Sequence, residues 1–189
     1  MAGPVDFVTI ENAIWNWVWS SSGLAAAQVM WASQNQPGLN APYITLRIGT
    51  IATIGLSDSV ELRLNPTPSP GAEILFIGRG QRRCTLTITC YGTTPIGATG
   101  AAAILDQVLG ALSLDPIASP LSAAGIGIAS YHDIVSIDGV VNSTLLEPRA
   151  SIDVIFFIGS EITVTGTNII SVDITDQIPA TPEKTTVHS

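Results

Sequence analysis

The chain is 189 residues long, with 46% hydrophobic residues, only 12% charged residues and a formal net charge of −8, which suits one domain with a sizeable core. Its 15 acidic residues against seven basic ones exclude the compact basic face of nucleic-acid-binding proteins, and no apolar run approaches the ~20 residues of a membrane span. So few charges favour a surface that is covered by neighbouring subunits, and the alternative is a monomer with a Ser/Thr-rich surface. The excess of acidic residues suits either a conduit through which DNA slides or simply a soluble protein.

The N-terminal segment lacks a basic region followed by an apolar core, so no secretory signal is expected. A helix is predicted over residues 6–21, with Asp6 as its N-cap and Gly23 as its stop. Trp15 and Trp19 lie off the apolar stripe, four residues apart, and are expected to stack on a second face. That face is either a partner surface or part of a wider buried stripe. The stripe itself comprises Phe7, Ile10, Ile14, Trp17 and Val18.

A long hairpin is predicted between residues 60 and 79. The segment 65–71 contains three prolines, which cannot donate hydrogen bonds to a sheet, so it is expected to be an exposed loop. Its flanks, 60–64 and 74–79, are the two arms of the hairpin. A projecting hairpin of this kind is suited to pairing with a neighbouring subunit.

Residues 82–91 alternate most clearly, with Cys84, Leu86, Ile88 and Cys90 on one face and mainly threonines on the other. This pattern is typical of a half-buried antiparallel strand. The two cysteines would lie ~20 Å apart along it, beyond disulfide reach, so we interpret them as reduced core thiols, consistent with a bacterial cytoplasm. Further strands are predicted at 29–32, 43–53, 126–137 (anchored by Ile126, Ile128 and Tyr131), 149–158 (central, because Ile155 and Phe157 lie opposite its core face) and 168–175.

A second helix is predicted over residues 98–112. Ser119-Pro120 is expected to begin a single helical turn that ends at Gly125. Together the elements predict an α+β domain over residues 1–178, with an antiparallel β-sheet covered by two helices and a projecting β-hairpin. Residues 179–189 lack core residues and are expected to form a flexible tail.

Catalytic chemistry is not predicted. His132-Asp133 could form one arm of a general-base pair, but no nucleophile follows a recognisable elbow. No cluster of His and Cys has metal-ligand spacing, and the cysteine spacing suits neither a redox pair nor a zinc site. The glycines of Gly78-Arg79-Gly80 and Gly125-Ile126-Gly127 lack the remaining features of a phosphate loop and are interpreted as turn or bulge glycines. Asn142-Ser143-Thr144 matches the glycosylation pattern, which means little without a secretory signal.

Half of the arginines, Arg79, Arg82 and Arg83, lie within five residues. Nucleic-acid contact is a weak interpretation for three arginines in an acidic protein. An ion pair to an acidic neighbouring subunit is favoured, because such pairs fix the register of an interface, and a solvated strand end is the alternative. The candidate subunit-interface residues are therefore Arg63, Arg79, Arg82, Arg83, Trp15 and Trp19.

Several separated segments, in their order along the chain, resemble the neck or tail-terminator proteins of tailed bacteriophages. The resemblance covers roughly residues 7–175. Two features depart from the usual pattern: Gln36 and Leu39 stand where arginines are common, and the polar C-terminal tail has no counterpart. The matching segments are Ile14-Trp15-Asn16-Trp17-Val18, Gly23-Leu24, Val29-Met30-Trp31-Ala32, Gln34-Asn35, Pro42-Tyr43-Ile44-Thr45-Leu46, the strand 82–89 with Tyr91-Gly92, Pro148-Arg149-Ala150, Ile152-Asp153-Val154 and Phe156.

The resemblance implies a structural virion protein without cofactor or catalytic residues. It implies a homo-oligomeric ring, usually hexameric, that caps the tail tube, ends its polymerisation and offers a platform to the head connector. DNA would pass through the lumen without specific binding, and assembly would take place in the host bacterial cytoplasm, with no membrane involved. The alternatives are another head–tail adaptor or tail tube protein, and a small hydrolase that uses His132.

Overall fold

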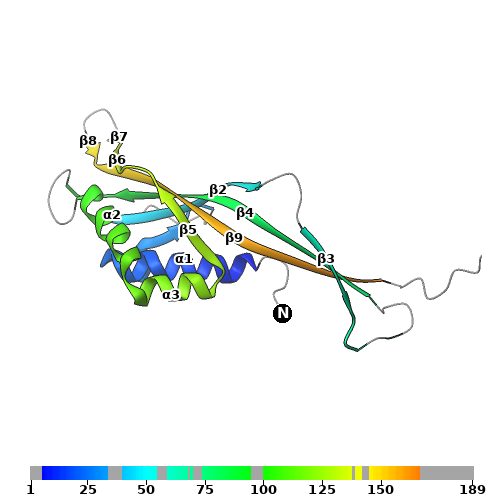
Figure 1. The fold of residues 1–189 in the computed structure, drawn as a ribbon. Coiled ribbons are helices and arrows are strands. Elements are labelled where there is room, and N and C mark those ends of the chain that lie inside the picture. The colour runs from blue at the N-terminus through cyan, green and yellow to red at the C-terminus, as the bar shows by residue number, and fades with distance from the viewer. Residues whose placement is uncertain are drawn as a thin grey trace, which may run out of the picture.

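Two long antiparallel strands, β4 (Ile74–Tyr91) and β9 (Arg149–Gly166), form the centre of the structure. The computed structural model describes residues 6–33, 40–54, 59–67, 69, 74–94, 100–137, 139–141 and 145–166. The fold is α+β: helices cover one face of a mostly antiparallel sheet, and β4 and β9 continue out of the body as a narrow projection (Figure 1). The predicted α+β fold class is therefore confirmed, with three α-helices on the sheet instead of the predicted two.

The sheet has seven strands among the described residues, with the path β1-β2-β4-β9-β5. Strand β3 pairs with β4 beyond the end of β2, and β6 pairs with β9. Only the β1–β2 pairing is parallel within this sheet. The remaining strands are β1 (Val29–Trp31), β2 (Tyr43–Thr53), β3 (Ser59–Leu64), β5 (Ile126–Tyr131) and β6 (Val135–Ser136), with a separate ribbon of β7 (Gly139–Val141) and β8 (Leu145–Glu147).

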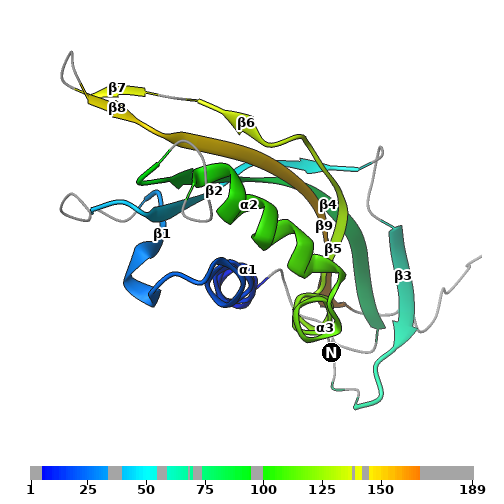
Figure 2. The same ribbon diagram turned by 90° about the vertical axis from the view of Figure 1, so that its left-hand side faces the viewer.

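Three α-helices lie on one side of the curved sheet: α1 (Phe7–Ser22), α2 (Ala101–Gly110) and α3 (Asp115–Ala123) (Figure 2). Short 3-10 turns, η1 (Ala26–Gln28) and η2 (Ala111–Ser113), follow the first two helices. Among the described residues no single helix is long and apolar enough to span a membrane. The segments Ala101–Ser113 and Asp115–Ala123 reach that length and composition only when taken together across a 74° bend.

Helix α1 begins and ends where its sequence predicts. The Asp6 carboxylate accepts hydrogen bonds from the backbone N–H groups of Val8 and Thr9, which have no partner within the helix. Gly23 ends the helix with a φ of 70°, a left-handed conformation that a side chain disfavours. Both predictions are confirmed.

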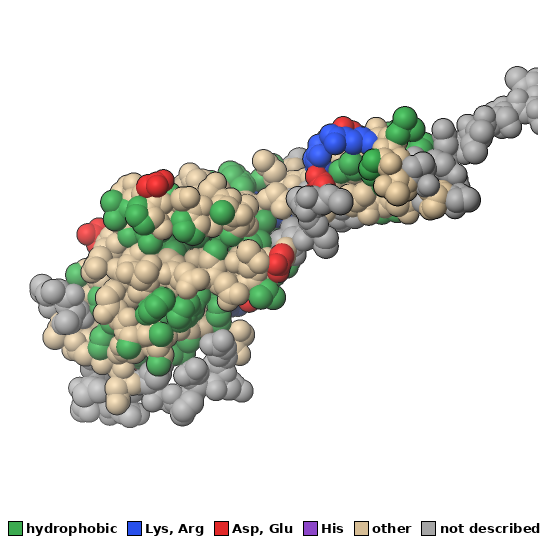
Figure 3. All heavy atoms as spheres, turned by 90° about the horizontal axis from the view of Figure 1, so that it is seen from below, with side chains coloured by type: hydrophobic (Ala, Val, Ile, Leu, Met, Phe, Trp, Pro, Cys, Tyr) green, Lys and Arg blue, Asp and Glu red, His purple; other side chains and the backbone are tan. Residues whose placement is uncertain are grey.

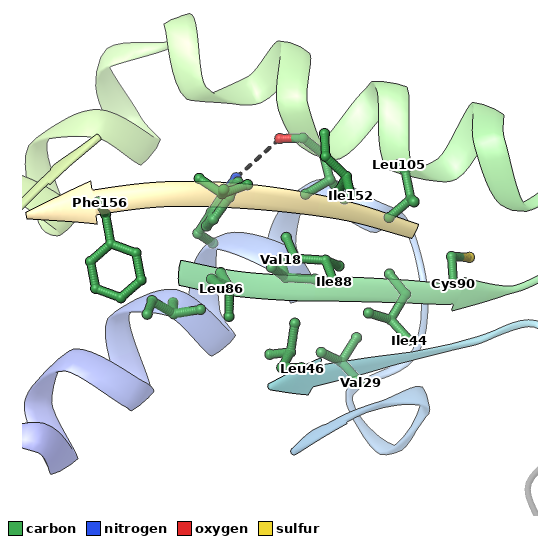
Figure 4. Close-up of a cluster of buried hydrophobic side chains, with 14 of the residues drawn as sticks. Val18, Val29, Ile44, Leu46, Leu86, Ile88, Cys90, Leu105, Ile152 and Phe156 are labelled. Carbon is green, nitrogen blue, oxygen red and sulfur yellow. Dashed lines mark hydrogen bonds between the residues drawn. The ribbon is translucent and has the colours of Figure 1, made fainter. Parts of the chain in front are cut away.

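The core lies between the sheet and the helices (Figure 4). The alternation predicted for residues 82–91 is confirmed, since Cys84, Leu86, Ile88 and Cys90 are all buried and both cysteines are free. The Trp17 indole Nε1 donates a hydrogen bond to the Val108 carbonyl at 3.0 Å and so joins α1 to α2 inside the core. The other fully buried side chains of this cluster include Ile10, Ile14, Val18, Ile44, Leu46, Leu105, Val154, Phe156 and Ile158.

Four details of the sequence interpretation are wrong. A helix begins at Asp115, not at Pro120, because Pro116 occupies the first turn, where the missing N–H is harmless, and Pro120 lies inside the helix. Gly78 and Gly80 lie within the regular β4–β9 ladder instead of a turn, so the predicted strands 74–79 and 82–91 are one strand. Gly127 likewise lies in a paired part of β5 and not in a turn or bulge. Strand β9 extends to Gly166, beyond its predicted end at residue 158. Phe7 and Tyr131 are exposed, not core anchors.

Other predictions hold. Gly125 is a turn glycine with a φ of 77°. Strand β9 is central, since β4 pairs with one edge and β5 and β6 with the other, and Ile155 on its second face is buried. The predictions for Gln36, Leu39, Asn142-Ser143-Thr144, the strand 168–175 and the tail 179–189 fall outside the described residues.

Candidate assembly surfaces

The projection, which we call the arm, consists of β3, residues 74–81 of β4 and residues 159–166 of β9. The sequence predicts a two-stranded hairpin here, and the structure adds β9 as a third strand. Eight residues of extended chain carry the arm ~26 Å beyond the body. The β4–β9 register runs without a shift from Ile74 to Tyr91, so the arm is a continuation of the central strands and not a hinged loop.

One face of the arm carries an ion-pair ladder across all three strands. Glu61 on β3 accepts from Arg63 at 2.7 Å and from Arg79 on β4 at 2.8 Å, and Arg79 Nε also donates to Glu161 on β9 at 2.8 Å. The hydrogen bond from Arg63 holds the pKa of Glu61 below its usual value, with further help from Arg79. The hydrogen bond to Glu161 raises the pKa of Arg79. These ion pairs connect the three strands of the arm within one chain.

The opposite face of the arm is apolar and exposed. Cross-strand partners share a face, so the register places Leu62, Phe76 and Val164 side by side, with Val60 and Leu64 next to them on β3. The Phe76 ring lies over Gly166, where an added Cβ would stand only 2.5 Å from the ring. The exposed fractions are 69% for Val60, 63% for Leu62, 79% for Leu64, 39% for Phe76 and 58% for Val164.

The arginines do not form one cluster. Because side chains alternate along β4, Arg82 points to the helix-bearing side of the sheet, while Arg79 and Arg83 point to the other side. Arg82 Nη1 donates to the Gln81 carbonyl at 3.2 Å. Arg83 is exposed at the root of the arm and lines a shallow groove with Ile54, Ile155 and Phe157.

Trp15 and Trp19 stack as predicted, with ring centroids 5.2 Å apart. Their surroundings differ. Trp15 is partly buried, and its Nε1 donates to the Val29 carbonyl at 2.8 Å, so this ring holds β1 against α1. Trp19 is 39% exposed and lines a small groove between α1 and α3, opposite Pro116 and Ile117. Trp19 is thus the member of the pair that a partner can reach.

The second face of the sheet, away from the helices, carries a polar network that the sequence did not reveal. Thr87 donates to the Asp153 carboxylate at 2.6 Å. Tyr43 and Tyr91 stack at 4.3 Å, and the Arg149 guanidinium lies 5.0 Å from the centre of the Tyr91 ring. Burial, followed by the charge of Glu147, raises the pKa of Tyr43. These residues are far apart in the sequence and meet only through the strand register, which no local pattern displays.

Catalytic residues were not predicted, and the described residues contain no group of three or more His, Cys, Asp or Glu side chains that could hold a metal. His132 is exposed after β5, and its backbone N–H donates to the Asp153 carbonyl at 2.9 Å. Figure 3 views the molecule from below, the side on which α1 and α3 lie in Figure 1: hydrophobic side chains reach the surface of the body, and both hydrophobic and charged side chains are visible on the arm.

A family model described as "Phage neck terminator protein" matches residues 8–181, nearly the whole chain. No curated protein matches the sequence.

Proposed function

Because the chain belongs to the phage neck terminator family and is thus a structural protein of the phage tail and neck, we propose that it forms a hexameric ring that caps the tail tube. In this proposal the ring ends polymerisation of the tube and presents its other side to the head connector. Its partners are copies of itself, the tail tube protein and the connector proteins. DNA crosses the lumen without specific binding, and the ring is assembled in the host bacterial cytoplasm before it becomes part of the virion.

The family match over residues 8–181 carries the proposal. The fold supports it, because a ring needs two unlike patches on each subunit, so that each contact is heterologous and closes after a fixed number of copies. The arm and the helix-bearing body are two such unlike surfaces at different ends of one molecule (Figure 1).

We propose the subunit interface at the arm, its root and the exposed end of the tryptophan pair. Arg63 and Arg79 hold the arm in shape through their ion pairs with Glu61 and Glu161. Arg82 and Arg83, on opposite sides of the sheet at the root, each approach acidic groups of neighbouring subunits. Trp19, supported by Trp15, lies in a second contact region on α1.

A phage that carries this gene tests the termination step. Replacing an early codon by a stop codon is expected to give filled heads without tails, together with free tubes of uncontrolled length, and a supplied wild-type copy should restore joined particles. Tails of normal length attached to heads in the absence of the protein would refute the proposal. Tubes of normal length that fail to join heads would instead identify an adaptor.

Deletion of residues 66–70 tests the part assigned to the hairpin. This deletion shortens the loop between β3 and β4 without removing either strand. The proposal expects impaired ring formation in a protein whose circular dichroism spectrum is unchanged. Intact rings from the shortened protein would show that the end of the hairpin takes no part in the interface.

A further inference from the structure

The apolar face of the arm continues the core-facing side of the sheet. Along β4, the core residues Cys84 and Leu86 are separated from Ile74 and Phe76 by even numbers of residues, and the ladder between them is regular. The four side chains therefore lie on the same side of the sheet. In the body this side of the sheet is covered by the helices, whereas in the arm no described helix covers it (Figure 1). The arm therefore presents a core-like surface that lacks its second layer, and exposed patches of this kind mark interaction sites.

The described body of the same chain cannot supply that layer. Both β4 and β9 run from the body into the arm without a register shift, so the arm is a continuous extension of the sheet. Its apolar face therefore lies beyond the end of the helical layer of the same chain (Figure 1). Folding the arm back onto its own helices would break this ladder. The described part of the chain thus leaves this face uncovered.

The body offers a matching acceptor, a groove of about 530 Å³ between α2, η2, α3 and β5. Its lining is mainly apolar and includes Leu109, Leu112, Ile128 and Tyr131. Pockets of this size take up large apolar groups, and the arm presents such groups in Leu62, Leu64 and Phe76. A protruding apolar surface and an apolar groove at different places on one molecule favour heterologous contacts between successive copies.

Charge also favours contact between an arm and a body. The stretches of sequence 55–83 and 159–166, which include the arm and its root, contain four acids and four arginines, so the rest of the sequence carries the whole net charge of −8. Two acidic bodies repel each other, whereas a neutral arm can approach an acidic body without this penalty.

We infer that the apolar face of the arm of one copy docks in the groove between α2 and α3 of the next copy. The occupant of each groove is thus a second copy of this chain, and the neighbour supplies the helical layer that the arm lacks. The contact itself is inferred from the structure, whereas its closure into a ring rests on the proposed function.

Single-cysteine variants test the contact directly. Leu62→Cys lies on the apolar face of the arm, Ala118→Cys lies exposed in the groove, and Thr163→Cys, exposed on the opposite face of the arm, is the matched control. The native cysteines are buried. In a mixture of L62C and A118C under mild oxidation, a disulfide-linked heterodimer is expected, and the mixture of T163C and A118C should give at least about tenfold less of it.

Each outcome of the cross-linking either supports or overturns the inference. A disulfide between two L62C chains would show that arms pair face to face and would overturn it. The absence of any L62C–A118C disulfide would also overturn it, whether or not rings form. In a double variant that carries both L62C and A118C, a disulfide within one chain would show that the arm reaches its own groove and would also overturn the inference. Rings without the linkage leave the proposed function standing. The linkage in open chains supports the inference and contradicts the ring.

A substitution provides an independent readout. Leu62→Asp places an unpaired charge on the apolar face and is expected to raise the concentration for half-association by about tenfold or more, since burying such a charge is unfavourable. Thr163→Asp introduces the same charge on the opposite face and should leave association unchanged. Equal association of both variants, with unchanged circular dichroism, would contradict the inference.

Discussion

Arg79 and Glu161 lie 82 residues apart in the chain, yet the Arg79 Nε donates to the Glu161 carboxylate at 2.8 Å across the β4–β9 ladder. This ion pair shows that the arm is a three-stranded extension of the main sheet and not an isolated hairpin. A two-stranded hairpin is only marginally stable by itself. Pairing with β9 thus explains how the arm can present two different faces in a fixed geometry.

Acid is expected to weaken the ion-pair ladder. The pKa of Glu61 is lowered in the folded protein, mainly by Arg63, so its contribution to stability is fully present above the unfolded-state pKa and is lost as pH falls through the folded-state pKa. Glu61→Gln should therefore reduce the dependence of the unfolding free energy on pH in the acidic range. Urea unfolding of both proteins between pH 7 and pH 3 measures this, and high salt should shrink the difference. Parallel pH profiles would contradict the assignment.

The cysteine thiols are expected to be unreactive in the folded protein. Burial raises the pKa of Cys90 to about 12 and also raises that of Cys84, and the thiolate is the reactive form. Labelling with iodoacetamide at pH 8 should modify neither residue until denaturant is added. Rapid labelling of Cys90 in native protein would show that the core between α2 and the sheet opens readily.

Gly23 and Gly110 should respond in opposite ways to alanine. Gly23 has a φ of 70° and open space around it, so G23A is expected to lower the unfolding free energy by about 1–2 kcal/mol through backbone strain alone. Gly110 lies in α2, also with open space, and G110A should raise stability by about 0.5–1 kcal/mol. Urea denaturation followed by circular dichroism compares the two. A neutral G23A would argue against the left-handed helix end.

Trp17→Phe is expected to destabilise the fold by about 1–3 kcal/mol, because it removes the buried hydrogen bond to the Val108 carbonyl and leaves unfilled volume. Trp19→Phe is the matched control, since Trp19 is 39% exposed, and it should change stability by less than about 0.5 kcal/mol. Chemical denaturation gives both values. Equal losses from the two substitutions would contradict the assigned positions of α1 and α2.

The features that the sequence predicted are those with local causes. Asp6 begins α1 and Gly23 ends it, each through interactions within one helical turn. The alternation of buried side chains from Cys84 to Cys90 follows from the two-residue period of a strand. The partner of Arg79 depends on the register between segments 82 residues apart, which no local pattern encodes. The start of α3 was predicted wrongly from Pro120, because proline favours the first turn of a helix. In the structure Pro116 occupies that turn and Pro120 lies inside the helix.

The candidate site was predictable in the same partial way. The hairpin and the Trp15–Trp19 stack could be predicted from turn residues and helical spacing. The division of the arm into a charged and an apolar face could not, because the third strand was missed at Gly159 and Ser160, which pair with Gln81 and Gly80 in an unbroken ladder. Small and polar residues at that position resemble a strand end when read alone.

The native mass of the purified protein, measured by light scattering together with negative-stain images of the same fraction, tests the central claim most directly. A discrete hexamer that appears as an annulus is the predicted result for a chain of 19.7 kDa. Open-ended tubes would contradict the account in favour of a tube protein. A monomer that persists at high concentration would contradict a ring built from contacts between copies alone.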